Sequence, residues 1–111
     1  MLSNELSEEL VISLNRDFAL SSEQLPVHSD VRYIKEKLTK VILHLLSHDL
    51  NRLLSIFYRI DLEEKKVNFI LTFSKPDKIA SELSELVYER ELEKVKTRLR
   101  YIAFFKDNDS Q

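Results

Sequence analysis

The chain contains no glycine in its 111 residues, and this absence restricts both the fold and the chemistry. Glycine supplies a positive φ without steric cost, so the tight hairpin turns of β-proteins depend on it. Helices tolerate its absence better, because other residues can end them. The P-loop, the dinucleotide-binding fingerprint and the nucleophile elbow all need glycine. We therefore predict an all-α fold without any of these three sites.

Length and composition favour one folded domain over residues 1–111. Apolar residues make up 43% of the chain and charged residues 32%, as in globular proteins rather than disordered ones. The chain has no cysteine, which excludes disulfides, thiolate nucleophiles and sulfur-ligated metals. A net charge of −2 predicts no particular partner. We expect no cofactor.

The N-terminus and the apolar runs give no sign of membrane targeting. The first ten residues, MLSNELSEEL, lack a basic segment and carry three glutamates where a signal peptide would be apolar. No apolar run approaches the roughly 20 residues of a membrane span. We expect a cytoplasmic protein without membrane contact.

Apolar residues at helical spacing predict helices over 4–20, 31–47 and 50–60. Asp30 is the expected N-cap of the second helix, and Asp49 or Ser47 that of the third. If the break at 47–49 is absent, a single helix covers 31–60. The core is expected from 31–60 and from the front of the last helix.

Two further start signals follow in the second half of the chain. Asp61 with Glu64 resembles a capping box and predicts a helix over 62–72. Residues 67–73 also suit a strand, which leaves their structure open. The segment from Ser74 to Asp77, with its proline, predicts a last helix reaching about Phe104. The prediction is a small bundle of four to five helices with a long C-terminal helix.

This last helix carries two apolar stripes about 160° apart at 100° per residue. The first contains Ile79, Leu83, Leu86 and Val87, and the second contains Tyr88, Leu92, Val95, Leu99 and Ile102. Three arrangements could cover both stripes: a kink near 88–91, the N-terminal helix of the same chain, or a second subunit. The segment 1–30 is therefore either loosely attached or packed on 88–105. For a homodimer, the predicted interface is Tyr88, Leu92, Val95, Leu99, Ile102 and Phe105.

Charge is distributed unevenly along the chain. Residues 1–30 carry six acids and one arginine, whereas residues 90–106 carry six basic and two acidic residues. Opposite charges would steer the two segments together, within or between chains. The basic face 90–106 also contains aromatic residues, so a nucleic-acid-associated protein is the alternative interpretation. Glu91 and Glu93 interrupt that face and weigh against it.

Few residues suggest chemistry. Arg90 shares a face with the first stripe and needs a carboxylate nearby, with Asp61 or Glu64 as candidates. We predict a structural ion pair involving Arg90, Asp61 and Arg59. His44 and His48 have a spacing that can bind metal, but the HExxH glutamate is missing, so we predict no metal site. No catalytic residue stands out, so a small enzyme is the third and least favoured of the functions considered.

Two segments carry a resemblance to a known family. They are LLSIFYRIDLEEKKV (53–67) and IASELSELVYERELEKVKTRLRY (79–101). The Tyr-Arg-Ile-Asp segment at 58–61, the Glu-Arg pair at 89–90 and the Lys-x-Lys-Thr-Arg run at 94–98 resemble a small family of all-helical bacterial proteins. The resemblance implies an all-helical bacterial cytoplasmic protein and brings no activity with it. Our functional hypothesis is a protein-interaction or assembly module that self-associates through its C-terminal helix.

Overall fold

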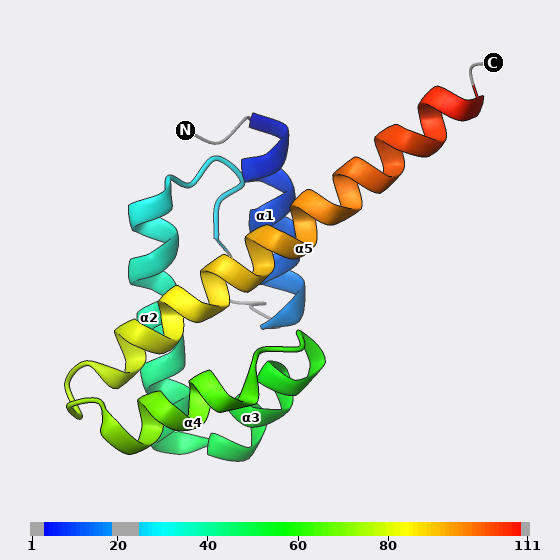
Figure 1. The fold of residues 1–111 in the computed structure, drawn as a ribbon. Helices are drawn as coiled ribbons and strands as arrows, with labels where there is room; N and C mark the ends of the chain where they lie inside the picture. The colour runs from blue at the N-terminus through cyan, green and yellow to red at the C-terminus, as the bar shows by residue number, and fades with distance from the viewer. Residues whose placement is uncertain (1–3, 19–24, 110–111) are drawn as a thin grey trace.

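The computed structural model describes residues 4–18 and 25–109, and these contain five α-helices (Figure 1). The helices are α1 (Asn4–Asp17), α2 (Val31–His48), α3 (Leu50–Arg59), α4 (Glu64–Phe73) and α5 (Ile79–Asp109). The ranges described contain no strand, and residues 67–73 are helical. The predicted all-α fold with a long C-terminal helix is confirmed.

The long helix α5 packs against most of the other helices (Figure 1). It contacts α1, α2 and α4, while α3 packs against α2. The 31 residues of α5 form a rod about 46 Å long at 1.5 Å per residue. Its C-terminal turns extend beyond the body formed by the other helices (Figure 1), so this end of α5 has no helix packed on it.

Aspartate side chains set the start of α2 and of α3. The Asp30 carboxylate accepts a hydrogen bond from the backbone N–H of Tyr33 at 2.8 Å. The Asp49 carboxylate accepts one from the N–H of Arg52 at 3.1 Å. Each bond satisfies a donor that a helix start leaves free. Both predicted caps are confirmed, and the break at Asp49 divides 31–60 into two helices.

Asp61 ends α3 instead of starting α4, so the predicted capping box is wrong. Its φ is 58°, in the left-handed region. The N–H of Asp61 donates to Tyr58 O and that of Leu62 donates to Phe57 O, both at 3.0 Å. This pair of bonds is a Schellman motif, in which glycine usually takes the left-handed position. Without glycine in the chain, an aspartate takes it, since Asp tolerates this conformation better than most residues.

Helix α1 is tied to the chain that follows it through an asparagine. Asn15 Oδ1 accepts from Leu25 N at 2.8 Å, and Asn15 Nδ2 donates to Leu25 O at 3.1 Å. The first helix was predicted over 4–20 and is observed over Asn4–Asp17. Residues 19–24, which include the end of that predicted helix, lie outside the described residues.

The core combines α1, α2, α3 and the first half of α5. Its most deeply buried apolar residues are Leu10, Val11, Leu14, Phe18, Ile34, Leu38, Ile42, Leu53, Ile56, Ile60, Leu83 and Val87. Large apolar side chains of this kind contribute about 1.5–3 kcal/mol each when fully buried. The prediction that 31–60 and the front of the last helix form the core is confirmed, and α1 adds a further layer.

The two stripes of α5 are covered in its first half by helices of the same chain. The contacts are with α2 and α1, which bury Leu83, Val87, Tyr88 and Val95. The Lys35 ammonium of α2 lies 4.7 Å from the centre of the Tyr88 ring, a cation–π distance. Residues 1–30 were expected to be either loosely attached or packed on 88–105. The helix of this segment, α1, packs against α5.

Candidate functional site

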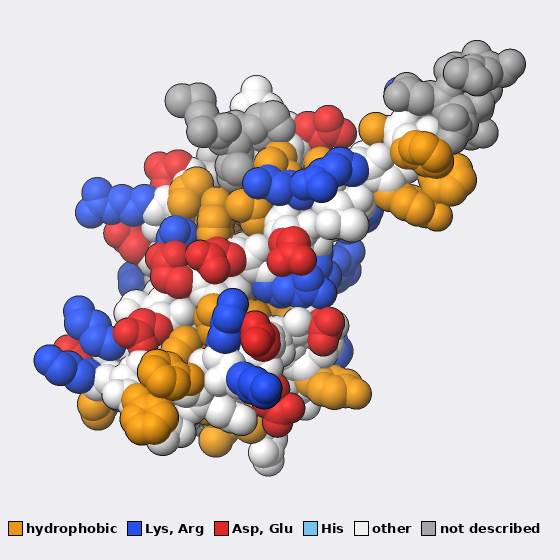
Figure 2. Space-filling view, in the orientation of Figure 1, with side chains coloured by type: hydrophobic (Ala, Val, Ile, Leu, Met, Phe, Trp, Pro, Cys, Tyr) orange, Lys and Arg blue, Asp and Glu red, His pale blue; other side chains and the backbone are white. Residues whose placement is uncertain are grey.

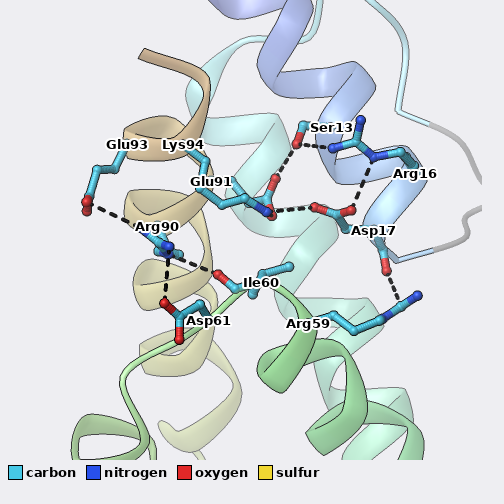
Figure 3. Close-up of polar contacts among 10 residues, drawn as sticks. All are labelled: Ser13, Arg16, Asp17, Arg59, Ile60, Asp61, Arg90, Glu91, Glu93 and Lys94. Atoms are coloured by element: carbon cyan, nitrogen blue, oxygen red, sulfur yellow. Dashed lines mark hydrogen bonds and ion pairs between the residues drawn. The ribbon is translucent and has the colours of Figure 1, made fainter. Parts of the chain in front are cut away.

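The predicted partners Arg90 and Asp61 lie together where α3 ends beside α5 (Figure 3). Arg90 Nη2 is 3.6 Å from Asp61 Oδ2. Arg90 Nε also donates to the backbone carbonyl of Ile60 at 2.9 Å, and Nη1 is 3.3 Å from Glu93 Oε1. The bond to Ile60 satisfies a carbonyl at the end of α3, so Arg90 fastens this helix end to α5.

Arg59 lies apart from that pair. Its Nη2 donates to the backbone carbonyl of Asp17 at 2.9 Å, at the last residue of α1 (Figure 3). A cation at the C-terminal end of a helix interacts favourably with the helix dipole. Arg59 therefore links α3 to α1, whereas Arg90 links α3 to α5. The sequence grouped the two arginines because it could not show which helix end each would reach.

The most unusual polar group is Glu91, which the sequence analysis did not select. Its side chain is fully buried between α1 and α5. Ser13 Oγ donates to Glu91 Oε2 at 2.6 Å (Figure 3). Lys94 Nζ lies 3.6 Å from Glu91 Oε1 and 3.5 Å from Asp17 Oδ2. Glu91 Oε1 accepts no hydrogen bond from any described residue, which is costly for an ionised carboxylate.

Burial raises the pKa of Glu91 to about 7, and a hydrogen bond with Asp17 adds to the rise, while Ser13 and Lys94 oppose it. Burial also raises the pKa of Asp17, but the Glu91 hydrogen bond, Lys94 and Arg16 outweigh it, and this pKa falls below its usual value. Of the two carboxyls, Glu91 is therefore the one that keeps its proton to higher pH, and Asp17 is the one that ionises first. Environments that push two pKa values apart in this way also occur in catalytic pairs.

Access decides against catalysis at this pair. The Glu91 side chain is 0% exposed, so its carboxyl is closed to a substrate from solvent in this fold, although the Asp17 side chain is 18% exposed. A general acid or base has to lie within hydrogen-bond reach of the reacting group. The arrangement can instead hold or release a proton between two packed helices, which makes the contact of α1 with α5 sensitive to pH.

The position of Glu91 explains why sequence patterns missed it. At about 100° per residue, Glu91 lies on the arc of the helix surface that separates the two apolar stripes of α5. The structure buries this arc as one continuous face, with Val87 and Val95 on either side of Glu91. Acidic residues are normally assigned to the solvated side of a helix. The one available signal was that a glutamate occupied the gap between two stripes.

A groove of about 530 Å³ runs along the same contact and is rich in cations, including Arg16, Arg90, Lys94 and Arg98. Each of these is already paired with a carboxylate. Arg16 pairs with Asp17, Arg90 with Asp61 and Glu93, Lys94 with Asp17 and Glu91, and Arg98 with Glu9. An incoming phosphate would have to displace these partners, so the groove is a poor anion site.

The two helical histidines stack on each other. The ring centres of His44 and His48 are 4.3 Å apart, and His48 Nδ1 is 3.0 Å from the carbonyl of His44. Across residues 4–18 and 25–109, no group of three His, Asp or Glu side chains could hold a metal ion. Residues four apart on a helix are neighbours on its surface, so the contact between the two exposed rings follows from their spacing alone.

The predicted interface residues divide into covered and uncovered ones. Tyr88 and Val95 are buried by the same chain, so a second chain cannot reach them in this fold. Leu92 and Leu99 are partly buried. Ile102 and Phe105 are exposed. The stripe is covered in its first half because α1 and α2 pack there, and only its C-terminal end is left uncovered.

The uncovered end forms an aromatic surface, which we call the distal segment (residues 100–106). Tyr101, Ile102, Phe104 and Phe105 are between 46% and 64% exposed. The rings touch one another: Tyr101 and Phe105 have centres 4.6 Å apart, and Phe104 and Phe105 5.6 Å. Figure 2 shows these hydrophobic side chains gathered on the part of α5 that extends from the body.

Comparisons with protein-family models, with curated proteins and with solved structures give no match. None of the described helices combines the length and the apolar character needed to cross a bilayer. Function must therefore be inferred from the surface and the contacts of this chain.

Proposed function

We propose that this protein is an interaction or assembly module that associates with a second copy of itself through the distal segment of α5. One observation carries the proposal: a projecting helix end exposes four large apolar side chains in a single cluster. Single exposed apolar residues are common on protein surfaces, but contiguous patches usually mark contact sites. Aromatic residues are also enriched at the energetic centres of protein interfaces.

The energy available from covering this cluster suits a reversible association. Full burial of one large apolar side chain contributes about 1.5–3 kcal/mol, and these four are about half exposed. Covering them would yield on the order of 4 kcal/mol from each chain by this area-based reckoning. Two chains together would offset a substantial part of the cost of association. A concentration-dependent equilibrium is therefore expected.

The nucleic-acid alternative draws less support. Three cations of the basic face 90–106, namely Arg90, Lys94 and Arg98, are engaged by carboxylates. The exposed Lys96, Arg100 and Lys106 remain for phosphate contacts. Affinity for nucleic acid depends on how many phosphates are neutralised. We therefore expect no electrophoretic mobility shift at micromolar protein, even at low salt.

Sedimentation equilibrium tests the proposal. The wild-type protein should show a mass that rises with concentration from 13.2 kDa towards twice that value. Phe104→Ser should remove this rise, because it removes an exposed ring from the cluster without touching the core. Phe73→Ser is the matched control: Phe73 is also an exposed aromatic, 72% accessible and 5.1 Å from Phe69, but it lies on α4.

Circular dichroism should show the same helix content and melting in both variants. A wild-type mass of 13.2 kDa at every concentration would contradict the proposal. So would equal association of the wild type and Phe104→Ser. If Phe73→Ser alone abolished association, the contact would belong to α4 and the assignment to α5 would be wrong.

A further inference from the structure

A second apolar surface lies in the groove between α3 and α4. This groove has a volume of about 550 Å³, within the range of ligand pockets, about 300–1,000 Å³. Its floor contains Phe57 and Val67, both nearly buried, and one wall carries Leu54 and Tyr58. Tyr58 is 87% exposed and Leu54 is 40% exposed. Such a concave apolar surface can accept aromatic side chains.

The rim of this groove is acidic. Asp61, Glu63 and Glu64 line it, and no lysine or arginine is among its lining residues. Asp61 pairs with Arg90 and Glu63 with Lys66, but these carboxylates are 92% and 59% exposed and stay accessible. Among the described residues, no cation forms an ion pair with Glu64. The groove therefore combines an apolar floor with an edge that attracts positive charge.

The distal segment of α5 has the complementary pattern. At about 100° per residue, its three aromatic residues and Ile102 occupy one side of the helix, while Arg100 and Lys106 flank them on opposite edges. Both cations are exposed. An aromatic ridge between two cations matches an apolar groove between carboxylates in both shape and charge. Such complementarity fixes register and excludes wrong contacts.

Charge also distinguishes this groove from a neighbouring one. The cleft between α4 and α5 is apolar as well, with about 370 Å³ lined by Phe69, Ile70 and Leu86. Its edge carries Lys65 and Lys66, which would repel Arg100 and Lys106. The groove between α3 and α4 is therefore the better match for a basic, aromatic helix end.

The distal segment cannot fill the groove of its own chain. It is the end of one continuous helix that points away from the body, whereas α3 and α4 lie on the side of the first half of α5 (Figure 1). The longest dimension of the molecule, 54 Å, reflects this extension. A second copy can supply what the same chain cannot. If each copy inserts its helix end into the groove of the other, the contact is two-fold symmetric and closes as a dimer.

We propose that the groove between α3 and α4 receives the distal segment of α5 from a second copy of the chain. This inference rests on the proposed self-association and names the surface that the distal segment meets. The aromatic rings enter beside Tyr58 and Leu54, and Arg100 and Lys106 face the carboxylates of the rim.

A charge exchange between two full-length variants tests the contact. The groove variant carries Glu63→Lys with Glu64→Lys, and the tip variant carries Arg100→Glu with Lys106→Glu. Alone, each variant places like charges at both contacts, so its dimer dissociation constant should rise about fivefold or more at low salt. Mixed in equal amounts, they place opposite charges at both contacts, so sedimentation velocity should show association restored. Asp77→Lys, an exposed change in the α4–α5 connection, is the control and should associate like the wild type.

The outcomes separate this inference from the proposed function. If the groove variant associates like the wild type while Phe104→Ser does not, the groove assignment is wrong and the distal segment remains the contact. If the mixture stays as weak as the separate variants, the rim does not face Arg100 and Lys106, and the inference is overturned. If the wild type is monomeric throughout, the proposed function fails and the groove assignment fails with it.

Discussion

Replacing Glu91 with glutamine should remove a pH-dependent loss of stability that the wild-type fold carries. Glutamine keeps the size of the side chain and imitates the protonated carboxyl, so it can still accept from Ser13 and donate to Asp17. The pKa of Glu91 is raised from 4.5 to about 7 in the folded protein. One pKa unit corresponds to about 1.4 kcal/mol, so ionisation of Glu91 costs the folded state about 3 kcal/mol.

The sign of the effect follows from proton binding. Between pH 4.5 and about 7, folded Glu91 holds a proton that the unfolded chain has lost. Stability therefore falls as pH rises through this window and levels off above it. Asp17, whose pKa is lowered, contributes in the opposite direction but only below its ordinary value of 3.8. It does not affect this window.

Urea unfolding followed by circular dichroism, at intervals from pH 5 to pH 8.5, measures the effect. Near pH 5 the wild type and Glu91→Gln should have similar free energies of unfolding. Near pH 8 the variant should be more stable by about 3 kcal/mol. The three histidines are common to both proteins and cancel in the difference. A difference that does not change with pH, or a wild type that gains stability between pH 5 and 7, would refute the reasoning.

Four further substitutions test individual contacts by urea unfolding or titration. Arg90→Ala should lower the free energy of unfolding by about 1–3 kcal/mol, because it leaves the Ile60 carbonyl at the end of α3 without its donor. Asp61→Asn should lower it by less than about 1 kcal/mol, since that carboxylate is exposed. Equal losses in the two variants would contradict this assignment. Ile42→Ala should cost about 2–5 kcal/mol by opening a cavity in the core, and a loss below 1 kcal/mol would place it outside the core. Ser13→Ala should raise the pKa of Glu91 further, because it removes a hydrogen bond that stabilises the ionised form. Carbon NMR of the Glu91 carboxyl as a function of pH measures this pKa. An unchanged or lower pKa in the variant would contradict the prediction.

The sequence predicted the helices well because their signals are local. Asp30 and Asp49 lie directly before periodic apolar runs, and a cap needs only its own helix start. The segment 67–73 was ambiguous because its β-branched and aromatic residues suit strands as well as helices. Packing of α4 against α5 and the burial of Val67 favour the helix in the fold. Asp61 was misassigned since an acidic residue between two helices suits either the end of one or the start of the next.

The site was less predictable because it depends on how distant helices meet. The pairing of Arg90 with a residue near 61 could be anticipated from a buried cation that needs a partner. Glu91 could not, since its burial depends on Ser13 and Asp17 of α1, more than seventy residues earlier in the chain. The exposed part of the second apolar stripe of α5 could not be predicted either, because it depends on where α1 and α2 pack along that helix.

Hydrogen–deuterium exchange along α5 as a function of protein concentration is the most direct test of self-association through the distal segment. In a monomer, turns without a packing partner exchange rapidly because helical stability comes mainly from tertiary contacts. Backbone amides of residues 100–106 should therefore become protected as concentration rises, while those near Val87, already buried, keep constant protection. Exchange in residues 100–106 that stays equally fast from dilute to concentrated protein would contradict the account.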